Sequence, residues 1–352
     1  MELMPSGVYN TRYQQEISIF RTKYQWAWFF AFLIFIFVIP SFISNYIAAI
    51  FNTMGILIVA ALGVQVVLGY CGQITLGQAA LVGVGAYSWS LLILRLAFPP
   101  LLAIPVAGII TAIIGVVFAL PSVRVKGFYL AIATLAAHIV IIYLITHMTG
   151  LTGGATRGLL APTMQIWGHE FVTDKDHWYI IMTVVGIMTF LVRNLARTRY
   201  GRAFIAVRDN DLAAEVMGIN VFLYKIIAFA ICSFCAGVAG SMWSMSAGLL
   251  HPDQFTLGDS IWYIAIIIVG GMGSVMGVIY GTVFMQLLQE FVLIATPVVS
   301  DMVPVLTEQA SSAMTAFLFG LTIALFLIYE PRGINHTWEI IKMRYRLWPF
   351  PH

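Results

Sequence analysis

Few side chains within the apolar part of this 352-residue chain could do chemistry, and most of them are uncharged. They gather around residues 69–78, a segment dense in glycine, glutamine and threonine that separates two apolar runs. Amide and hydroxyl groups hydrogen-bond a polar or zwitterionic solute without adding a fixed charge. In a membrane, irregular backbone is tolerated only where it is buried in protein or lines a wet cavity. The segment is therefore either a solute path or a turn between two helices, and the candidate path residues are Gln65, Gln73, Thr75, Gln78 and His138.

Ionisable groups are scarce within the apolar runs. His138 is the clearest, and Arg95 and Glu290 lie near the ends of runs. A charge at the centre of a membrane helix costs on the order of 3 kcal/mol, and ion-coupled carriers usually need carboxylates at that depth. Neither those carboxylates nor a pair suited to intramembrane proteolysis is visible. His138 is either a hydrogen-bonded packing residue or a residue lining a path.

The cysteines and the nucleotide-binding motifs point away from catalysis. Cys232 and Cys235 have C-x-x-C spacing, but no second pair completes a zinc site. We predict that they are small buried residues on one helix. The motif G-x-x-x-x-G-K-[ST] is absent, so a P-loop does not bind nucleotide here. We expect no catalytic residue, no metal, no nucleic-acid partner and no cofactor on this chain.

Composition places these residues in a membrane protein. The chain is 61% hydrophobic and only 9% charged, whereas soluble domains carry about 25% charged residues. The expected fold class is an all-α polytopic membrane protein with about ten transmembrane segments, some broken or re-entrant. The apolar runs are 26–44, 46–68, 79–96, 101–120, 128–147, 178–192, 226–245, two segments within 261–294 around a bend at 270–274, and 310–329.

Small residues recur every fourth position in two of these runs, as in Gly273, Gly277 and Gly281. Ser233, Gly237 and Ser241 repeat the spacing. Such residues let helix backbones approach closely in lipid. We therefore expect a tightly packed bundle.

The polar stretch 197–225 contains the signals of a short helix. Asn210 and Asp211 can cap its first N–H groups, and Gly218 suits the left-handed residue that ends a helix. Ala213, Val216 and Met217 share one face. Because about two turns are not stable alone, packing against the bundle or against a partner protein must hold this helix.

Basic residues give the orientation, because Lys and Arg are enriched in cytoplasmic connections. Fifteen of the 18 lie before the first run, in 121–127, in 193–225 or after the last run. With ten crossings these regions share one side. We predict a cytoplasmic tail at 1–25, a transmembrane domain at 26–329 with its polar stretch 197–225 in the cytoplasm, and a basic, aromatic cytoplasmic tail at 330–352 that could lie on the membrane surface.

Several stretches taken in order resemble the LivM-type permeases of branched-chain amino-acid ABC importers. They are GYCGQITLGQ (69–78), LPSVRVKGFYLAIAT (120–134), LTGG (151–154), YGRA (200–203), AVRDNDLAAEVMGIN (206–220), VGGMGS (269–274) and EPRG (330–333). The resemblance covers most of the chain, from about residue 52 to residue 333. Gln78 departs from it, because many relatives have His there, which leaves the solute open.

The resemblance implies a half-transporter of the bacterial inner membrane that works by alternating access. Its partners would be a homologous second permease, two ATPase subunits that bind ATP and Mg²⁺, and a periplasmic solute-binding protein. It also implies that the 210–218 helix is a coupling helix docking on an ATPase. The residues that match its pattern are Asp211, Ala213, Ala214, Glu215 and Gly218.

Two other classes of function were weighed. An ATP-independent channel or facilitator for a neutral solute such as urea or an amide has the same composition, and co-purification with ATPases would distinguish it. A membrane enzyme is disfavoured, because neither a carboxylate pair nor a His/Cys metal cluster is apparent.

Overall fold

The computed structural model describes residues 36–302, with the exception of 126 and 167–168. It also describes isolated positions between 317 and 330 and all of residues 333–347. Seven helices in this part are long and apolar enough to cross a membrane. The polytopic helical class is thus confirmed. The first and last predicted segments lie largely outside the described residues, so the count of ten stays a prediction. The seven are α3 with its π-helical extension (Asn45–Tyr70), α4 (Gln78–Leu96), α5 (Pro100–Ser122), α6 (Phe128–His147), α9 (Asp174–Arg197), α12 (Val221–Ala247) and α14 (Val275–Met302).

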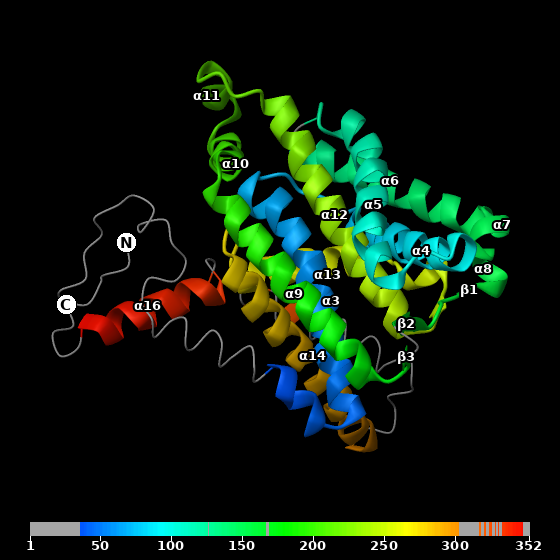
Figure 1. The fold of residues 1–352 in the computed structure, drawn as a ribbon. Helices are drawn as coiled ribbons and strands as arrows, with labels where there is room; N and C mark the ends of the chain where they lie inside the picture. The colour runs from blue at the N-terminus through cyan, green and yellow to red at the C-terminus, as the bar shows by residue number, and fades with distance from the viewer. Residues whose placement is uncertain are drawn as a thin grey trace, which may run out of the picture.

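The bundle is built around α12, which packs against α3, α4 and α5 (Figure 1). The contact depends on small residues. A Cβ added at Gly85 of α4 would lie 2.5 Å from the Cα of Gly237, and Gly237 also meets Gly108 of α5. Cys232 and Cys235 are buried thiols on the same helix. Close packing and the buried cysteines, both predicted from the sequence, are confirmed.

The predicted bend at 270–274 is also present. α13 (Leu257–Gly270) ends at Gly271, whose φ of +118° suits only glycine, and α14 starts at Val275. Gly270 packs against Gly277 and Gly281, which is why two helices can turn back on each other here.

The helix directions bring two of the basic regions, 121–127 and 193–225, to one end of the bundle. α5 runs antiparallel to α12, since Gly108 meets Val238 and Gly115 meets Ser233. The connection after α5, with Arg124, therefore lies at the same end as the start of α12 (Figure 1). The segment between α9 and α12 lies at this end as well. Which side of the membrane this end faces stays a prediction.

The segment 150–177, which connects the predicted runs 128–147 and 178–192, contains regular structure. It holds two helices of one turn and strands that form two short antiparallel pairs. α9 also starts earlier than predicted, because Thr173 and Asp176 form a capping box before it. The elements are α7 (Thr149–Thr152), α8 (Gly154–Arg157), β1 (Leu159–Leu160) paired with β4 (Leu249–Leu250), and β2 (Met164–Ile166) paired with β3 (His169–Phe171).

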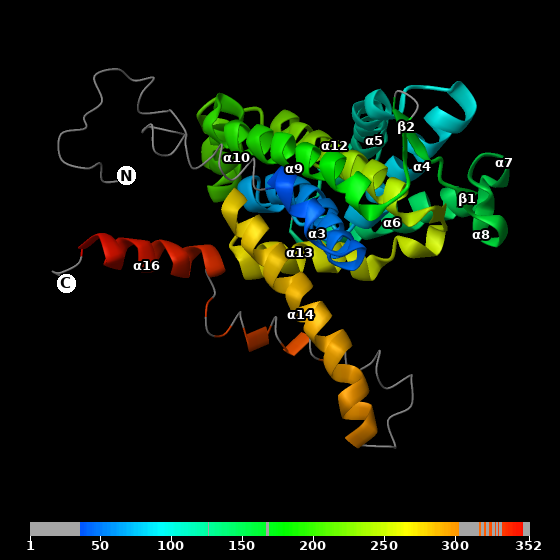
Figure 2. The ribbon, with the colours of Figure 1, turned by 60° about the horizontal axis from the view of Figure 1, so that its bottom comes forward.

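The C-terminal segment forms a helix, α16 (Ile334–Leu347), that leads away from the bundle (Figure 2). Its start is fixed to the α13–α14 bend, because Gly333 packs against Gly271. The Trp338 ring lies 6.4 Å from the Tyr280 ring of α14. A position on the membrane surface remains a prediction for this helix.

Candidate functional site

Two short helices occupy the polar stretch between α9 and α12. They are α10 (Arg199–Asp209) and α11 (Asp211–Val216). We predicted α11 but not α10. The signal for α10 was present in the spacing of Ala203, Phe204 and Val207, which form its buried face.

Local signals define α11 as predicted. The Asn210 carboxamide oxygen accepts from the backbone N–H groups of Leu212 (3.0 Å) and Ala213 (3.1 Å). After the helix, Gly218 has a φ of +85°, a conformation that glycine adopts without strain.

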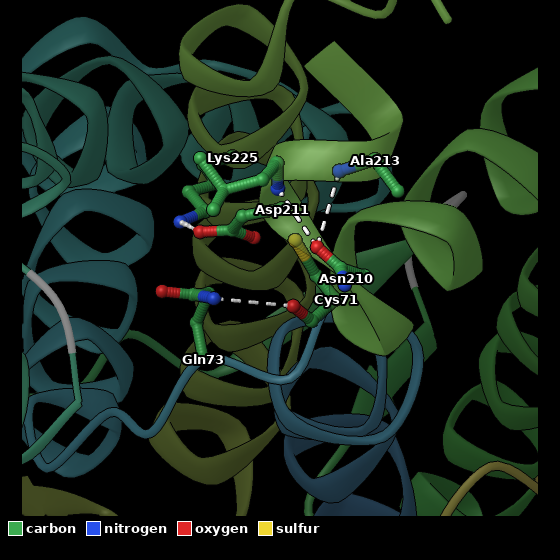
Figure 3. Close-up of polar contacts among 7 residues, drawn as sticks. Cys71, Gln73, Asn210, Asp211, Ala213 and Lys225 are labelled. Atoms are coloured by element: carbon green, nitrogen blue, oxygen red, sulfur yellow. Dashed lines mark hydrogen bonds and ion pairs between the residues drawn. The ribbon is translucent and has the colours of Figure 1, made fainter. Parts of the chain in front are cut away.

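An ion pair fixes α11 to α12. Lys225 donates to the Asp211 carboxylate at 2.8 Å (Figure 3), and the Lys225 side chain is only 3% exposed. We had placed Lys225 at the end of the polar stretch, and this is wrong, because α12 starts at Val221 and buries it. A buried ammonium needs a partner. Asp211 and the buried Ala214 are therefore the contacts that hold α11.

The rest of α11 faces outward. Of the five residues matched to a coupling helix, Ala213, Glu215 and Gly218 are exposed. The exposed fractions of the Val216 and Met217 side chains are 87% and 82%. The predicted face of Ala213, Val216 and Met217 is thus not packed against the bundle, and it leaves an apolar surface free.

The irregular segment before α4, residues 71–77, is preceded by a distorted end of α3. Residues Gln65–Tyr70 are π-helical, a feature often found at functional sites. Gly69 leaves room for the Gln65 carboxamide, because a Cβ on it would lie 2.6 Å from the carboxamide carbon. With its carboxamide oriented so that the oxygen faces the bend, the orientation that satisfies both of its groups, Gln65 accepts from the backbone N–H groups of Gly273 (2.6 Å) and Ser274 (2.7 Å). The π-helical segment Gln65–Tyr70 and the bend at 271–274 therefore lie against each other.

Arg208 of α10 connects these segments to the polar stretch. It donates to the Gly69 carbonyl at 2.9 Å, and its side chain covers Gly72, where a Cβ would be 2.7 Å from the Arg208 Cγ. Arg208 also pairs with Asp209 at 3.0 Å. α10 and α11 thus contact both α12 and the break that precedes α4.

The chain then turns back into the bundle before α4 begins. Leu76 N–H donates to Thr134 of α6 at 3.0 Å. Gln78 is fully buried, and it donates to the Ala60 carbonyl (2.9 Å) and accepts from the Cys232 thiol (3.0 Å). Ala60 lies ten residues before Tyr70, well inside α3. Residues 71–77 therefore start beside α10 and lead the chain back into the bundle, where Gln78 pairs with Ala60.

None of the three cavities found among the described residues brings the predicted path residues together. Gln73 donates to the Cys71 carbonyl at 3.2 Å (Figure 3). Thr75 borders a void of only about 20 Å³, and His138 is buried with Nδ1 unpaired among the described residues. None of the five lines the cavity of about 380 Å³ between α3, α13 and α14. Their role in a solute path stays a prediction.

Comparison with known proteins gives a consistent result. The family model described as branched-chain amino acid transport system / permease component matches residues 46–329. The chain is 26% identical over 302 residues to the high-affinity branched-chain amino acid permease LivM of Salmonella typhimurium, covering 79% of this chain and 67% of LivM. For LivM of Escherichia coli the identity is 26% over 318 residues, covering 84% and 71%.

A second group of relatives is named for another solute. The autoinducer 2 import system permease LsrC of Salmonella typhi is 28% identical over 211 residues, covering 55% of this chain and 57% of LsrC. No solved structure matches the chain.

Proposed function

The chain belongs to the family of permease components of branched-chain amino acid transport systems, and from this premise we propose that it is one of two permease subunits of an ATP-binding-cassette importer. A homologous permease, two ATPase subunits and a periplasmic solute-binding protein complete the complex in the bacterial inner membrane. Nucleotide hydrolysis belongs to the ATPases, since this chain lacks a P-loop motif. Both termini and the α10–α11 segment face the cytoplasm.

The observation that carries this proposal is the combination of contacts at α11. One side of the helix is fixed by the Asp211–Lys225 pair, and the other side exposes Val216 and Met217. Apolar side chains exposed together on a polar connection indicate a protein-binding surface. α11 therefore docks on an ATPase subunit.

The contacts also define how movement of α11 reaches the bundle. Lys225 transmits it to α12, and Arg208 transmits it to the break at Gly69. Gln65 continues the connection to Gly273. Closure of the ATPases tilts these elements together, and access to the solute path changes from one side of the membrane to the other.

The cargo is a branched-chain amino acid or a similar small solute. The LivM relatives are named for branched-chain amino acids, and each of the two covers more of this chain than LsrC does. An aliphatic amino acid is therefore the favoured cargo.

The test replaces Val216 and Met217 together by Asp. Both side chains are exposed, so the fold stays intact while docking on an apolar groove is lost. We expect co-purification with the ATPases and ATP-dependent leucine uptake to fall at least tenfold. The matched control is Val172→Asp, which changes a side chain that is 63% exposed before the start of α9, at the other end of the bundle.

Undiminished uptake by the double variant would contradict docking through α11. Leucine flux through the chain alone, in vesicles without ATPase, would instead support the facilitator. If the control lost uptake equally, the loss would reflect added charge rather than docking.

A further inference from the structure

A cavity of about 380 Å³ lies between α3, α4, α12, α13 and α14, on the side of α12 away from α5. A smaller cavity of about 190 Å³ adjoins it. Thr53 and Trp243 line both, so the two cavities form a continuous lining that starts near the Asn45 end of α3. Sites for small ligands have volumes of about 300–1,000 Å³. The larger cavity has the size of a ligand site.

Three residues of this lining each carry a buried polar atom that has no hydrogen-bond partner among the described residues. The atoms are the amide oxygens of Gln286 and Asn52 and the indole nitrogen of Trp243. Gln286 is 5% exposed and Asn52 1%. Because buried polar groups are nearly always paired, each exception calls for an explanation. A bound polar ligand supplies the missing partners.

In both amides, Asn52 and Gln286, the NH₂ group has a partner and the oxygen has none among the described residues. The Asn52 NH₂ group donates to the Asp174 carbonyl at 2.8 Å, and the Gln286 NH₂ group points to the Glu290 carboxylate at 3.5 Å. Two acceptor oxygens thus remain for a ligand rich in N–H donors. The Trp243 N–H remains for a ligand acceptor.

The charges of the lining select the ligand further. Asp259 lines the larger cavity and Asp174 the smaller one, whereas no Lys, Arg or His is among the described residues that line either. A positively charged group of a ligand can therefore pair with these carboxylates. A carboxylate group of a ligand finds only uncharged hydrogen-bond donors among the described residues of the lining. Leu57, Val82 and Phe255 add an apolar wall of the kind that accepts an aliphatic side chain.

We propose that these cavities bind a zwitterionic α-amino acid with an aliphatic side chain. Its ammonium group lies at Gln286 and Asp259, its carboxylate accepts from Trp243, and its side chain packs against Leu57 and Phe255. The inference rests on the proposed function as a solute permease and places the solute within this subunit. None of the path residues predicted from the sequence takes part in it.

The experiment measures equilibrium binding of radiolabelled L-leucine to the full chain in lipid nanodiscs. For Gln286→Leu, which keeps the volume but removes the oxygen, we expect at least tenfold weaker binding. For Trp243→Phe, which keeps a ring but removes the N–H, we expect about threefold to tenfold weaker binding, the range of one neutral hydrogen bond. The keto acid 4-methyl-2-oxopentanoate, which lacks the ammonium group, should not compete.

The matched controls are Gln165→Leu and Trp178→Phe. Gln165 is an exposed glutamine of β2, and the indole N–H of Trp178 donates to the Ile36 carbonyl, away from both cavities. Both should bind leucine as the unmodified chain does. If the unmodified chain binds leucine and the Gln286 and Trp243 variants bind it equally well, the cavity assignment is overturned and the proposed function stands. If leucine does not bind, or the keto acid competes equally, the ligand class is overturned, and coupling through α11 is still decided by the Val216/Met217 variant.

Discussion

α12 has two unlike surroundings, one closed and one open. Toward α4 and α5, glycines allow backbone contact, and the serines on this side are paired. The Ser244 and Ser90 hydroxyls lie 2.7 Å apart, and Ser233 donates to the Phe229 carbonyl at 2.8 Å. Toward α3, α13 and α14, Trp243 instead borders a cavity, and its N–H has no partner within the part of the chain that the structure describes.

The two surroundings of α12 suit different roles, one in holding the helices together and the other in binding a solute. Where small residues meet, little volume remains for a solute, and the hydroxyls are satisfied by the protein itself. Where large and polar residues meet without filling the space, hydrogen-bonding groups stay available. In the proposal above, the closed side gives structural support and the open side binds the solute.

The largest expected effect comes from Gly240→Leu on the closed side. A Cβ at this position would lie 2.6 Å from the Ala86 backbone nitrogen. Overpacking against side chains typically costs about 1–3 kcal/mol. The added leucine here meets backbone atoms of the facing helix, which yield less than side chains, so the cost exceeds that range and we expect loss of monodisperse protein in size-exclusion chromatography. Gly186→Leu on α9, where nothing lies within 4 Å, should retain it. Equal yields from the two variants would refute the contrast between the faces.

A smaller loss is expected from Asp211→Asn, which leaves the Lys225 ammonium buried without its carboxylate. Breaking a buried pair from one side costs about 3–5 kcal/mol, so the apparent melting temperature should fall by several degrees. Asp209→Asn removes a pair whose side chains are 39% and 62% exposed, and surface pairs contribute only about 0–1 kcal/mol. A fall of the same size in both variants would mean that the burial of Lys225 has no energetic consequence.

The smallest change in stability is expected on the open side. Gln286→Leu removes an oxygen that has no partner among the described residues, and loss of an unsatisfied polar group is close to neutral or stabilising. The melting temperature should stay within about 2 °C of the unmodified chain or rise, which corresponds to under about 1 kcal/mol. A clear drop would show that Gln286 is already paired in the folded chain, and the cavity would lose its recognising group.

Several elements followed from residues that act locally. The apolar runs became helices, because burying helical backbone in lipid requires internal hydrogen bonds. Asn210 and Gly218 delimited α11, since a cap and a left-handed residue act within one turn. Gly271 marked the bend in the same way. The structure of the long connection 150–177 was not predictable in this way, because its strand β1 pairs with β4. Their partners Leu160 and Leu249 are 89 residues apart in the sequence.

The site was predicted less completely. Asp211 was identified as part of a coupling helix, but its partner Lys225 was interpreted as an end of the polar stretch. Gln286 lay unmarked in an apolar run, although an amide there is the kind of signal that indicates a path. Gln78 was a path candidate, yet the fold satisfies it with Ala60 and Cys232.

The sequence by itself determined that the chain is a helical membrane protein of this permease family, and where its short capped helix lies, because hydropathy and capping depend on neighbouring residues. Only the tertiary structure decided which face of α11 is free, that Gln65 and Arg208 connect the π-helical segment to the bend and to α10, and that Gln286, Trp243 and Asn52 line adjoining cavities. Those relations depend on how helices distant in sequence pack. Packing in turn depends on the fit of side chains across interfaces, which residue order does not reveal one segment at a time.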